Sequence, residues 1–339
     1  MTQKIVVTGV GATTPLGGDA RSTWKALLAG ESGISTIDKD WVAQYELPVT
    51  FAGQAKVNAA EVLTPQEIKR LDPSSQFALI AAREAWADAG TPDVAPERLA
   101  VEYATGIGGV WTLLDAYDAL KEKGPRRVLP MTIPMLMPNG PAAAIGMDIA
   151  ARGGVRTAVS ACASSTEAVA NAIARLQSGD IDVVVAGGCE SGIHPLPIAA
   201  FAAMHALSRN NENPAGASRP YDLARDGFVM GEGADAPRPV HAPRLDQHIG
   251  RLAPVGARIH AQGAAEGAGN AGQKFEPAAI LRRRRARCGH RPVGGASVSI
   301  SARNSRWSCS ATLMRWAFIA SDRDARSASM LRRFAAQSP

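Results

Sequence analysis

The chain has 339 residues, of which 46% are hydrophobic and 20% charged, so it can form one large domain or two with a sizeable core. Its formal net charge of +6 is uneven, because residues 1–234 contain 19 basic and 25 acidic residues whereas residues 235–339 contain 18 basic and 6 acidic ones. The four cysteines show no CxxC pair, which excludes a disulfide framework and a zinc site, and no apolar segment approaches the roughly 20 residues that span a bilayer. We therefore predict a soluble cytoplasmic protein without a membrane or metal site.

The first elements alternate between strand and helix. "KIVVTGV" is a short β-branched run that ends in glycine, which predicts a buried strand. "RSTWKALLAGES" follows, with Trp24, Leu27 and Leu28 at helical spacing and Gly30 as the expected end of the helix.

The next elements repeat this alternation. "SSQFALIAAREAWADAG" predicts a helix capped by Ser74 or Ser75 and ended by Gly90, with an apolar face of Phe77, Ile80, Ala81 and Ala85. "LAVEYATGIGG" predicts a strand that runs into a glycine turn, and "IDVVVAGGCES" a continuous apolar strand. Strands buried on both faces with helices between them are typical of a layered α/β domain.

Cys162 lies between a strand-like segment and a helical one. "ACASSTEAVANAIARLQSG" offers Ser164, Ser165 and Thr166 as caps and Gly179 as the end, and it is apolar on almost every side, so we expect a buried helix. The N-terminal end of a helix favours a thiolate and lowers the pKa of a cysteine, which suits a nucleophile. The alternative is that Cys162 is a small buried hydrophobic residue, the usual role of a free cysteine.

Three glycine-rich stretches admit simpler interpretations. "TGVGATTPLG" has Gly9 and Gly11, but Thr14 replaces the third glycine of a dinucleotide-binding motif and no acidic residue follows at the right place, so we predict no dinucleotide site. "TGIGG" and "AGGCESG" end strands, where packing accounts for them unless a ligand approaches the backbone. "RPYDLARDGFVMGEGA" is consistent with an ordinary polar turn.

The regular pattern stops after residue 234. Residues 235–339 are rich in arginine, alanine, glycine and proline and lack sustained periodicity, so we predict a divergent tail that is not a folded domain. Its arginine run could contact phosphates, but no aromatic residues are interleaved and no zinc spacing is present. We therefore expect a solvated tail and no nucleic-acid binding.

Six stretches, in order and covering residues 3 to about 234, resemble the β-ketoacyl-acyl carrier protein synthases of the elongating subgroup, the condensing enzymes of fatty acid synthesis. They are "IVVTGVGATTPLG", "TGIGG", "TAVSACASSTEAV", "DVVVAGGCES", "LSRNNENPAGASRPYD" and "RDGFVMGEGA". The resemblance implies a thiolase-like fold of two similar layered α-β-α halves, of which residues 1–234 would form the first, and a homodimer. It implies a decarboxylating Claisen condensation with malonyl-acyl carrier protein, with acyl carrier protein as partner and no cofactor.

The resemblance also assigns roles to three residues. Cys162 matches the cysteine that accepts the acyl group as a thioester, and its N–H would form half of an oxyanion hole. Ile107 and Phe201 match positions that line the acyl pocket. A polyketide ketosynthase, or a non-catalytic partner of the chain-length-factor type, would share the same motifs.

The family's later motifs are not recognisable in this sequence. These motifs contain a histidine in HGTxT, a lysine and a histidine in KxxxGH, and a phenylalanine in GFGGxN. The segments of this sequence that could correspond to the first two, "IHAQGAAEG" and "RARCGHRPVGG", do not match them. We hypothesise that residues 235–339 are a frameshifted or altered reading of a synthase gene. The missing half would leave an apolar face uncovered, so we predict poor solubility.

Overall fold

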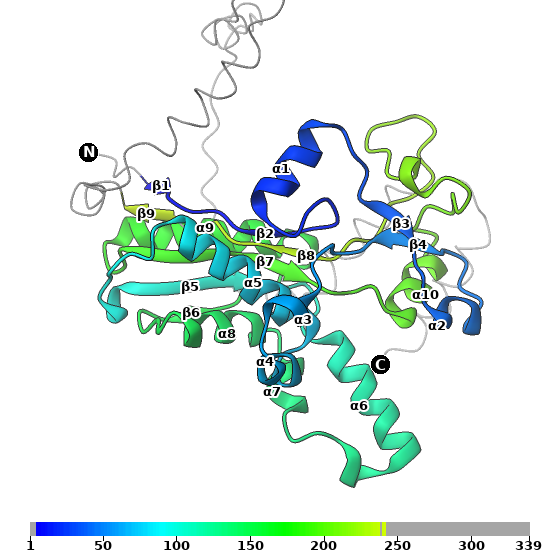
Figure 1. Ribbon diagram of the computed structural model, residues 1–339, viewed down its shortest axis with the longest axis horizontal. Helices are drawn as coiled ribbons and strands as arrows, with labels where there is room; N and C mark the ends of the chain where they lie inside the picture. Colours follow the sequence, from blue (N-terminus) through cyan, green and yellow to red (C-terminus); the bar gives the residue numbers. More distant parts are fainter. Residues whose placement is uncertain (1–4, 238, 242–339) are drawn as a thin grey trace, which may run out of the picture. The chain divides into compact units, whose positions relative to one another are not determined.

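The computed structural model describes residues 5–237 and 239–241. The central feature of this part is a seven-stranded mixed sheet (Figure 1). Its main path runs β1-β9-β7-β5-β6, with β8 also pairing with β7 and β2 with β8. The strands are β1 (Ile5–Val7), β2 (Ala12–Thr13), β5 (Leu99–Ala104), β6 (Val155–Arg156), β7 (Val183–Glu190), β8 (Gly233–Asp235) and β9 (Pro239–His241).

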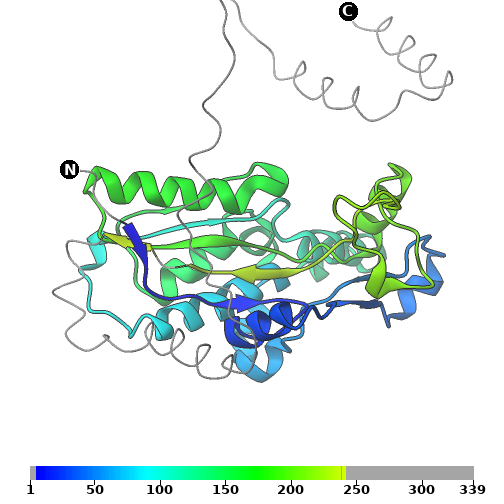
Figure 2. The same ribbon diagram turned by 90° about the horizontal axis from the view of Figure 1, so that it is seen from above.

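Helices cover both faces of this sheet (Figure 2). Helices α5 (Pro73–Asp88) and α8 (Gly140–Asp148) pack on one face, and α9 (Ser164–Ser178) packs on the other. The strands β5, β6 and β7 are parallel, and alternate residues of β5 and β7 enter the two cores: Val101, Tyr103 and Val185 towards α5, and Ala100, Val184 and Ala186 towards α9. The predicted layered α/β fold is thus confirmed, with central strands that are mainly apolar on both faces because both are covered.

A smaller sheet and several short helices complete the described part. β3 (Ile34–Thr36) pairs antiparallel with β4 (Phe51–Gly53), and these strands share a second core with α10 (Pro195–Ala203). The other helices are α1 (Ala20–Leu28), α2 (Asp40–Gln44), α3 (Ala59–Val62), α4 (Pro65–Arg70), α6 (Val110–Lys123) and α7 (Thr132–Leu136), with 3-10 turns η1 (Pro96–Arg98), η2 (Pro125–Arg127), η3 (Ala161–Ala163) and η4 (Pro214–Gly216). None of the described helices has the length and hydropathy to cross a membrane.

The sheet continues past residue 234, where the sequence analysis places a domain boundary. β8 ends at Asp235 and pairs with both β2 and β7, and β9 pairs with β1. The rest of the predicted tail, including Cys288, Cys309 and the arginine run, lies outside the described residues.

One early strand differs from the prediction in its burial, and the helix after it has an exposed apolar side. β1 is at the end of the sheet, and Val7 is 56% exposed, so the expectation of a buried strand is wrong. In α1 only Ala26 is buried, and the apolar trio of that helix, namely Trp24, Leu27 and Leu28, is exposed within the described part. The spacing correctly predicted a helix, but it could not say whether a partner would cover its apolar side.

Helix α5 is capped by a residue that the prediction overlooked. Its N-cap is Asp72, whose carboxylate accepts hydrogen bonds from the Ser74 N–H at 3.0 Å and the Ser74 hydroxyl at 2.7 Å. The expectation of a serine cap is therefore wrong by two or three positions, because Pro73 occupies the first helical position and lacks an N–H to be satisfied. The predicted buried face is confirmed, and Gly90 follows the helix in a left-handed conformation.

The glycines near the start serve close helix packing. A side chain on Gly9 would collide with the carbonyl oxygen of Ala85, and one on Gly11 with the carbonyl oxygen of Ala81, both on α5. The backbone that precedes β2 therefore lies directly against this helix.

We expect Gly11→Ala to lower the free energy of unfolding by about 1–3 kcal/mol, because the new methyl group must displace a helix backbone. Urea denaturation of the full chain measures this change. Gly18→Ala is the matched control, since its added Cβ would lie 3.8 Å from Val57, an ordinary contact. Equal stability of the two variants would contradict this account of the glycines.

A buried ion pair crosses the layer between α9 and the sheet. Arg175 Nη1 of α9 lies 2.9 Å from Glu102 Oε1 of β5, and the Glu102 side chain is only 2% exposed. Arg175 also donates to the carbonyl oxygens of Gly153 and Gly154. The charge on the central strand is therefore neutralised and hydrogen-bonded within the protein, as burial of a carboxylate requires.

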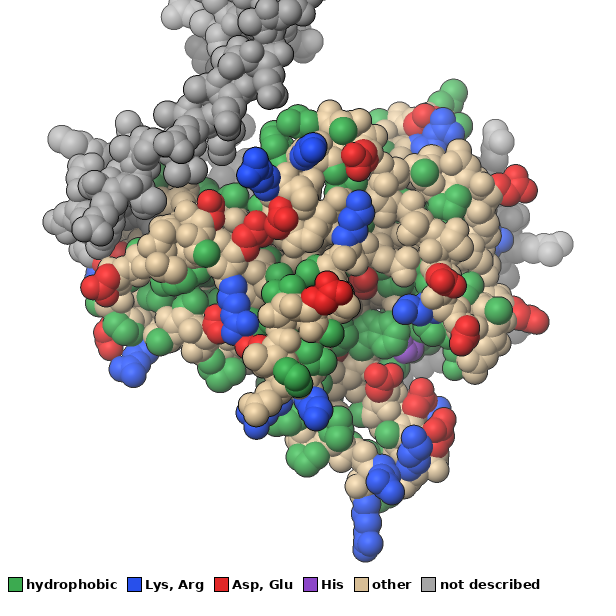
Figure 3. All heavy atoms as spheres, viewed as in Figure 1, with side chains coloured by type: hydrophobic (Ala, Val, Ile, Leu, Met, Phe, Trp, Pro, Cys, Tyr) green, Lys and Arg blue, Asp and Glu red, His purple; other side chains and the backbone are tan. Residues whose placement is uncertain are grey.

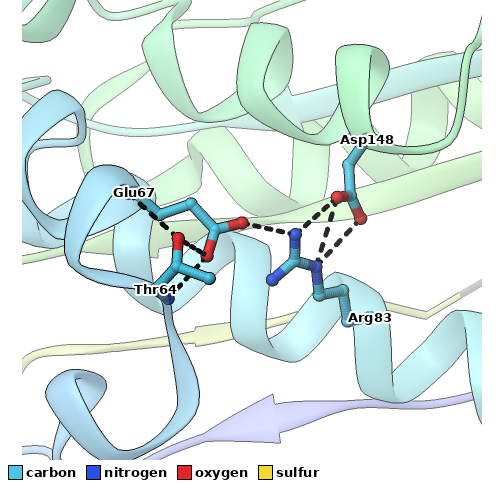
Figure 4. Close-up of polar contacts among 4 residues, drawn as sticks. All are labelled: Thr64, Glu67, Arg83 and Asp148. Atoms are coloured by element: carbon cyan, nitrogen blue, oxygen red, sulfur yellow. Dashed lines mark hydrogen bonds and ion pairs between the residues drawn. The ribbon is translucent and has the colours of Figure 1, made fainter.

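A second ion network joins three helices on the surface (Figure 4). Arg83 of α5 donates to Glu67 of α4 at 2.6 Å and to Asp148 of α8 at 2.6 Å. Glu67 also accepts from the Thr64 N–H at 2.8 Å. The hydrogen bond from Arg83, followed by that from Thr64, lowers the pKa of Glu67 from its ordinary value of 4.5 to about 2.

This shift predicts an acid-dependent contribution to stability. The folded protein holds the Glu67 carboxylate more strongly than the unfolded chain does, so the contribution is present above pH 4.5 and is lost as the pH falls towards 2. We expect Glu67→Gln to be less stable than the parent at pH 6 by about 0.5–1 kcal/mol, and the difference to disappear near pH 2. Urea midpoints at several pH values measure it, and a difference independent of pH would contradict the assignment.

Candidate active site

The candidate site lies where the parallel strands end. β6 and β7 lie on opposite sides of β5. The chain therefore moves to one side of β5 to form β6 and to the other side to form β7, which changes the strand order at the carboxyl end of β5. Ligand sites of open α/β sheets are commonly found at such a change of direction, beyond the carboxyl ends of the strands. The loops after β5, β6 and β7 carry the TGIGG turn, Cys162 and the start of α10 respectively.

Cys162 lies in the 3-10 turn η3 directly before α9, and it is exposed. The preceding residue, Ala161, has a φ of +52°, a conformation that L-residues rarely adopt and that is concentrated at functional sites. Ser164 fixes the turn, since its hydroxyl accepts from the Ser160 N–H at 2.9 Å and donates to the Ala161 carbonyl at 2.7 Å. The structure thus presents the thiol at the N-terminal end of a helix, as the sequence predicts.

Two details of α9 correct the sequence analysis. Its N-cap is Ala163 and no side chain caps it, because Ser164 bonds back to the turn before it, whereas Gly179 ends the helix in a left-handed conformation as predicted. The helix is not buried on all sides in the described part. Ala168, Ala172 and Leu176 are buried, while Ala170, Ile173 and Gln177 on the opposite side are exposed.

The second described cysteine has a different environment. Cys189 lies in β7 within the core shared with α5, and burial raises the pKa of its thiol well above the ordinary value. A thiol must ionise to attack a carbonyl, so Cys189 is inert while buried. Of the two cysteines in the described part, only Cys162 is accessible to a substrate.

The TGIGG turn lies against the Cys162 turn. An added Cβ at Gly106 would be 3.5 Å from the Ala161 carbonyl oxygen, so the two backbones approach closely. Ile107 is at the tip of the TGIGG turn and is 48% exposed. The structure therefore brings the segments of two predicted site residues, Cys162 and Ile107, side by side.

The third predicted residue, Phe201, lies on α10. Its partly buried ring contacts Phe228 edge to face, with 5.2 Å between ring centroids. At the start of α10, His194 accepts from the Leu196 N–H and its ring contacts Trp111 of α6 at 4.6 Å. Burial lowers the pKa of His194. Phe201 is thus connected to the region after the TGIGG turn through the start of its helix, where His194 contacts Trp111.

Two carboxylates near these turns, the partly buried Glu190 and the buried Asp72, were missed by sequence reasoning. Glu190, at the end of β7, accepts from the Gly106 N–H at 2.9 Å and from the Thr105 hydroxyl at 3.3 Å. Asp72 accepts from the Thr112 N–H at 3.1 Å and its hydroxyl at 2.8 Å, in addition to its bonds with Ser74. The "DPSS" run could have indicated the cap on α5, but the bonds to Thr112 and to the TGIGG turn depend on tertiary contacts.

Comparison with known proteins agrees with this arrangement. The family described as "Beta-ketoacyl synthase, N-terminal domain" matches residues 2–236. The 3-oxoacyl-[acyl-carrier-protein] synthase 2 of Mycobacterium tuberculosis is 43% identical over 230 residues, which cover 68% of this chain and 55% of the relative. The chain therefore spans only about half the length of that relative.

Two solved structures share the fold. A β-ketoacyl synthase from Burkholderia phymatum has a TM-score of 0.65 at 27% identity, over 73% of this chain and 61% of that one. A ketosynthase in complex with its type II polyketide synthase acyl-carrier protein has a TM-score of 0.63 at 25% identity, over 73% and 60% of the two chains. The match of the N-terminal domain to more than two thirds of the sequence, together with the layered fold, shows that the chain belongs to the β-ketoacyl synthase family.

Proposed function

We propose that this chain takes part in fatty acid elongation as a 3-oxoacyl-acyl carrier protein synthase, and that Cys162 accepts the acyl group. The observation that carries the proposal is the exposed Cys162 in a strained turn at the start of α9, against the turn that bears Ile107. A thiolate suits this step because it attacks a thioester readily and also leaves readily. Ile107 and Phe201 would line the acyl pocket.

The acyl transfer balances without a cofactor. The Cys162 sulfur attacks the thioester carbonyl carbon, the bond to the carrier's pantetheine sulfur breaks, and the thiol proton passes to the departing thiolate. The Cys162 N–H would help to stabilise the oxyanion of the intermediate. The acyl group thus moves from one thioester to another.

The partner of this step would be acyl carrier protein, in a cytoplasmic setting. The similar ketosynthase that was solved in complex with its own acyl-carrier protein supports this choice. The later step would be decarboxylation of malonyl-acyl carrier protein, followed by attack of the enolate on the Cys162 thioester. The histidine motifs of that step are not recognisable in residues 235–339, so we propose acylation, and not condensation, as the activity of this sequence as written.

Sequential incubation tests the proposal. The full chain is incubated with radiolabelled acyl-acyl carrier protein, and malonyl-acyl carrier protein is then added. We expect label on Cys162 after the first addition and no elongated product after the second. Absence of label would refute acyl transfer, and an elongated product would refute the restriction to acylation.

A polyketide ketosynthase is the second candidate, supported by the similarity to a type II polyketide synthase complex. A chain-length-factor-like partner would fold in the same way but would lack acyl transfer. Labelling of Cys162 from saturated acyl starters and from β-ketoacyl starters separates the first two functions, because a polyketide ketosynthase would accept an unreduced β-keto chain. Persistent failure to label Cys162 would favour the third.

We further propose a homodimer, on the basis of two surfaces. β6 pairs only with β5 among the described residues, so one edge of the sheet is open to a second copy. The arm formed by α6 and α7 carries hydrophobic side chains beside charged ones (Figure 3), and Leu113, Tyr117, Leu129 and Ile133 are each at least half exposed. Sedimentation of the full chain measures this association.

A further inference from the structure

Glu190 has a position from which it can control the acyl-binding side of the site. It ends β7, and its carboxylate turns towards the loop that follows β5. Burial raises its pKa, while the hydrogen bonds from Gly106 and Thr105 act in the opposite direction. A partly buried carboxylate requires such partners, and those of Glu190 include Thr105 and Gly106 of the TGIGG turn.

The contacts form a closed clamp on that turn. The Gly106 N–H donates to Glu190 Oε2 at 2.9 Å, and the Thr105 hydroxyl donates to Glu190 Oε1 at 3.3 Å or Oε2 at 3.4 Å. The same hydroxyl accepts from the Gly108 N–H at 3.0 Å. The residues on both sides of Ile107 are therefore tied, directly or through Thr105, to one carboxylate.

The clamp also sets the distance between the two turns of the site. Gly106 lies between Glu190 and Ala161, since an added Cβ would be 2.9 Å from Glu190 Oε2 and 3.5 Å from the Ala161 carbonyl oxygen. Without the carboxylate the TGIGG turn loses its fixed approach to the Cys162 turn. Ile107, whose side chain is exposed at the tip, moves with it.

We propose that Glu190 is a positioning residue that holds Ile107 against the Cys162 turn and thereby controls how the site discriminates between short and long acyl chains. This inference rests on the proposed function, in which Cys162 accepts an acyl group beside Ile107. Glu190 acts through the TGIGG turn and does not touch the reacting atoms.

The test uses alkylation of Cys162 in the full chain by N-methyl and N-octyl iodoacetamide, with the modified peptide identified by mass spectrometry. In the parent protein we expect the ratio of the octyl to the methyl alkylation rate to be higher at Cys162 than with free glutathione, which has no binding site. Glu190→Ala should reduce that octyl-to-methyl ratio about fivefold, the effect of losing one or two hydrogen bonds. Thr105→Val should also reduce the octyl-to-methyl ratio.

Two further variants separate positioning from general stability. Glu190→Gln should keep the ratio within about twofold, since one amide oxygen can accept from both Gly106 and Thr105. Glu84→Ala is the matched control, because Glu84 also accepts two backbone N–H bonds, from Ala12 and Ala20, but holds a different loop. A variant that is merely less stable changes both alkylation rates alike and leaves the ratio unaltered.

The outcomes decide between the two proposals. An unchanged ratio in folded Glu190→Ala and Thr105→Val overturns the clamp, and if Glu190→Ala does not fold, Thr105→Val decides alone. If the parent protein takes no acyl group from acyl-acyl carrier protein but the variants still change the alkylation ratio, the clamp stands and the acyl-transfer function fails. If the parent protein is acylated by acyl-acyl carrier protein but the variants leave the octyl-to-methyl ratio unchanged, the acyl-transfer function stands and the clamp is overturned.

Discussion

Replacing Arg175 by methionine is expected to lower the free energy of unfolding by about 3–5 kcal/mol. The substitution leaves the Glu102 carboxylate, which is 2% exposed, without its cation in the middle of β5. It also frees the carbonyl oxygens of Gly153 and Gly154 in the loop before β6. Urea denaturation of the full chain at pH 7 measures the loss.

A double variant distinguishes the charge from the packing. In Glu102→Leu with Arg175→Met both charges are removed together, and hydrophobic replacements of a buried pair are often neutral or stabilising. We therefore expect the double variant to recover most of the stability lost in the single one. A double variant as unstable as Arg175→Met would mean that the loop contacts, and not the unpaired carboxylate, dominate.

Replacing Cys162 by alanine is expected to abolish covalent labelling by acyl-acyl carrier protein, because the attacking sulfur is removed. The small size and the exposure of this residue mean that the fold should be retained. Labelling is followed by autoradiography and by the mass of the tryptic peptide that contains residue 162. The melting temperature of the variant should stay within a few degrees of that of the parent chain.

Cys189→Ala is the matched control for this prediction. Its sulfur is buried in the core, where burial raises the pKa of the thiol, so it should contribute nothing to labelling. We expect this variant to be labelled like the parent but to melt at a lower temperature. Loss of labelling in folded Cys189→Ala, or its persistence in Cys162→Ala, would contradict the assignment of the nucleophile.

The central layers were predictable from the sequence because their signals are local. Residues 99–104 and 183–190 are mainly apolar runs followed by glycines or a charge, and this pattern is typical of a strand with helices on both faces. Helix α5 has its apolar side at helical spacing and was predicted with its buried face. The exposure of β1 and of the apolar side of α1 was not predictable, since it depends on whether another segment covers them.

The candidate site was predictable only in part. The motif around Cys162 indicated a thiol at a helix start, and the structure has it there. The bonds of Asp72 to Thr112 and of Glu190 to Gly106 left no local pattern, because each joins segments far apart in the sequence. The positive φ of Ala161 was not indicated by its residue type either, since alanine rarely adopts it. Whether Ile107 and Phe201 line an acyl pocket stays a prediction.

The double role of Asp72 has a mechanical consequence. One buried carboxylate binds the first turns of both α5 and α6, because it accepts from Ser74 in one helix and from Thr112 in the other. The base of the α6 arm is therefore attached to the central layers through Asp72. Bending at its root would break hydrogen bonds to a buried carboxylate, so we expect the arm to bend farther out, towards the turn at Gly124 that ends α6.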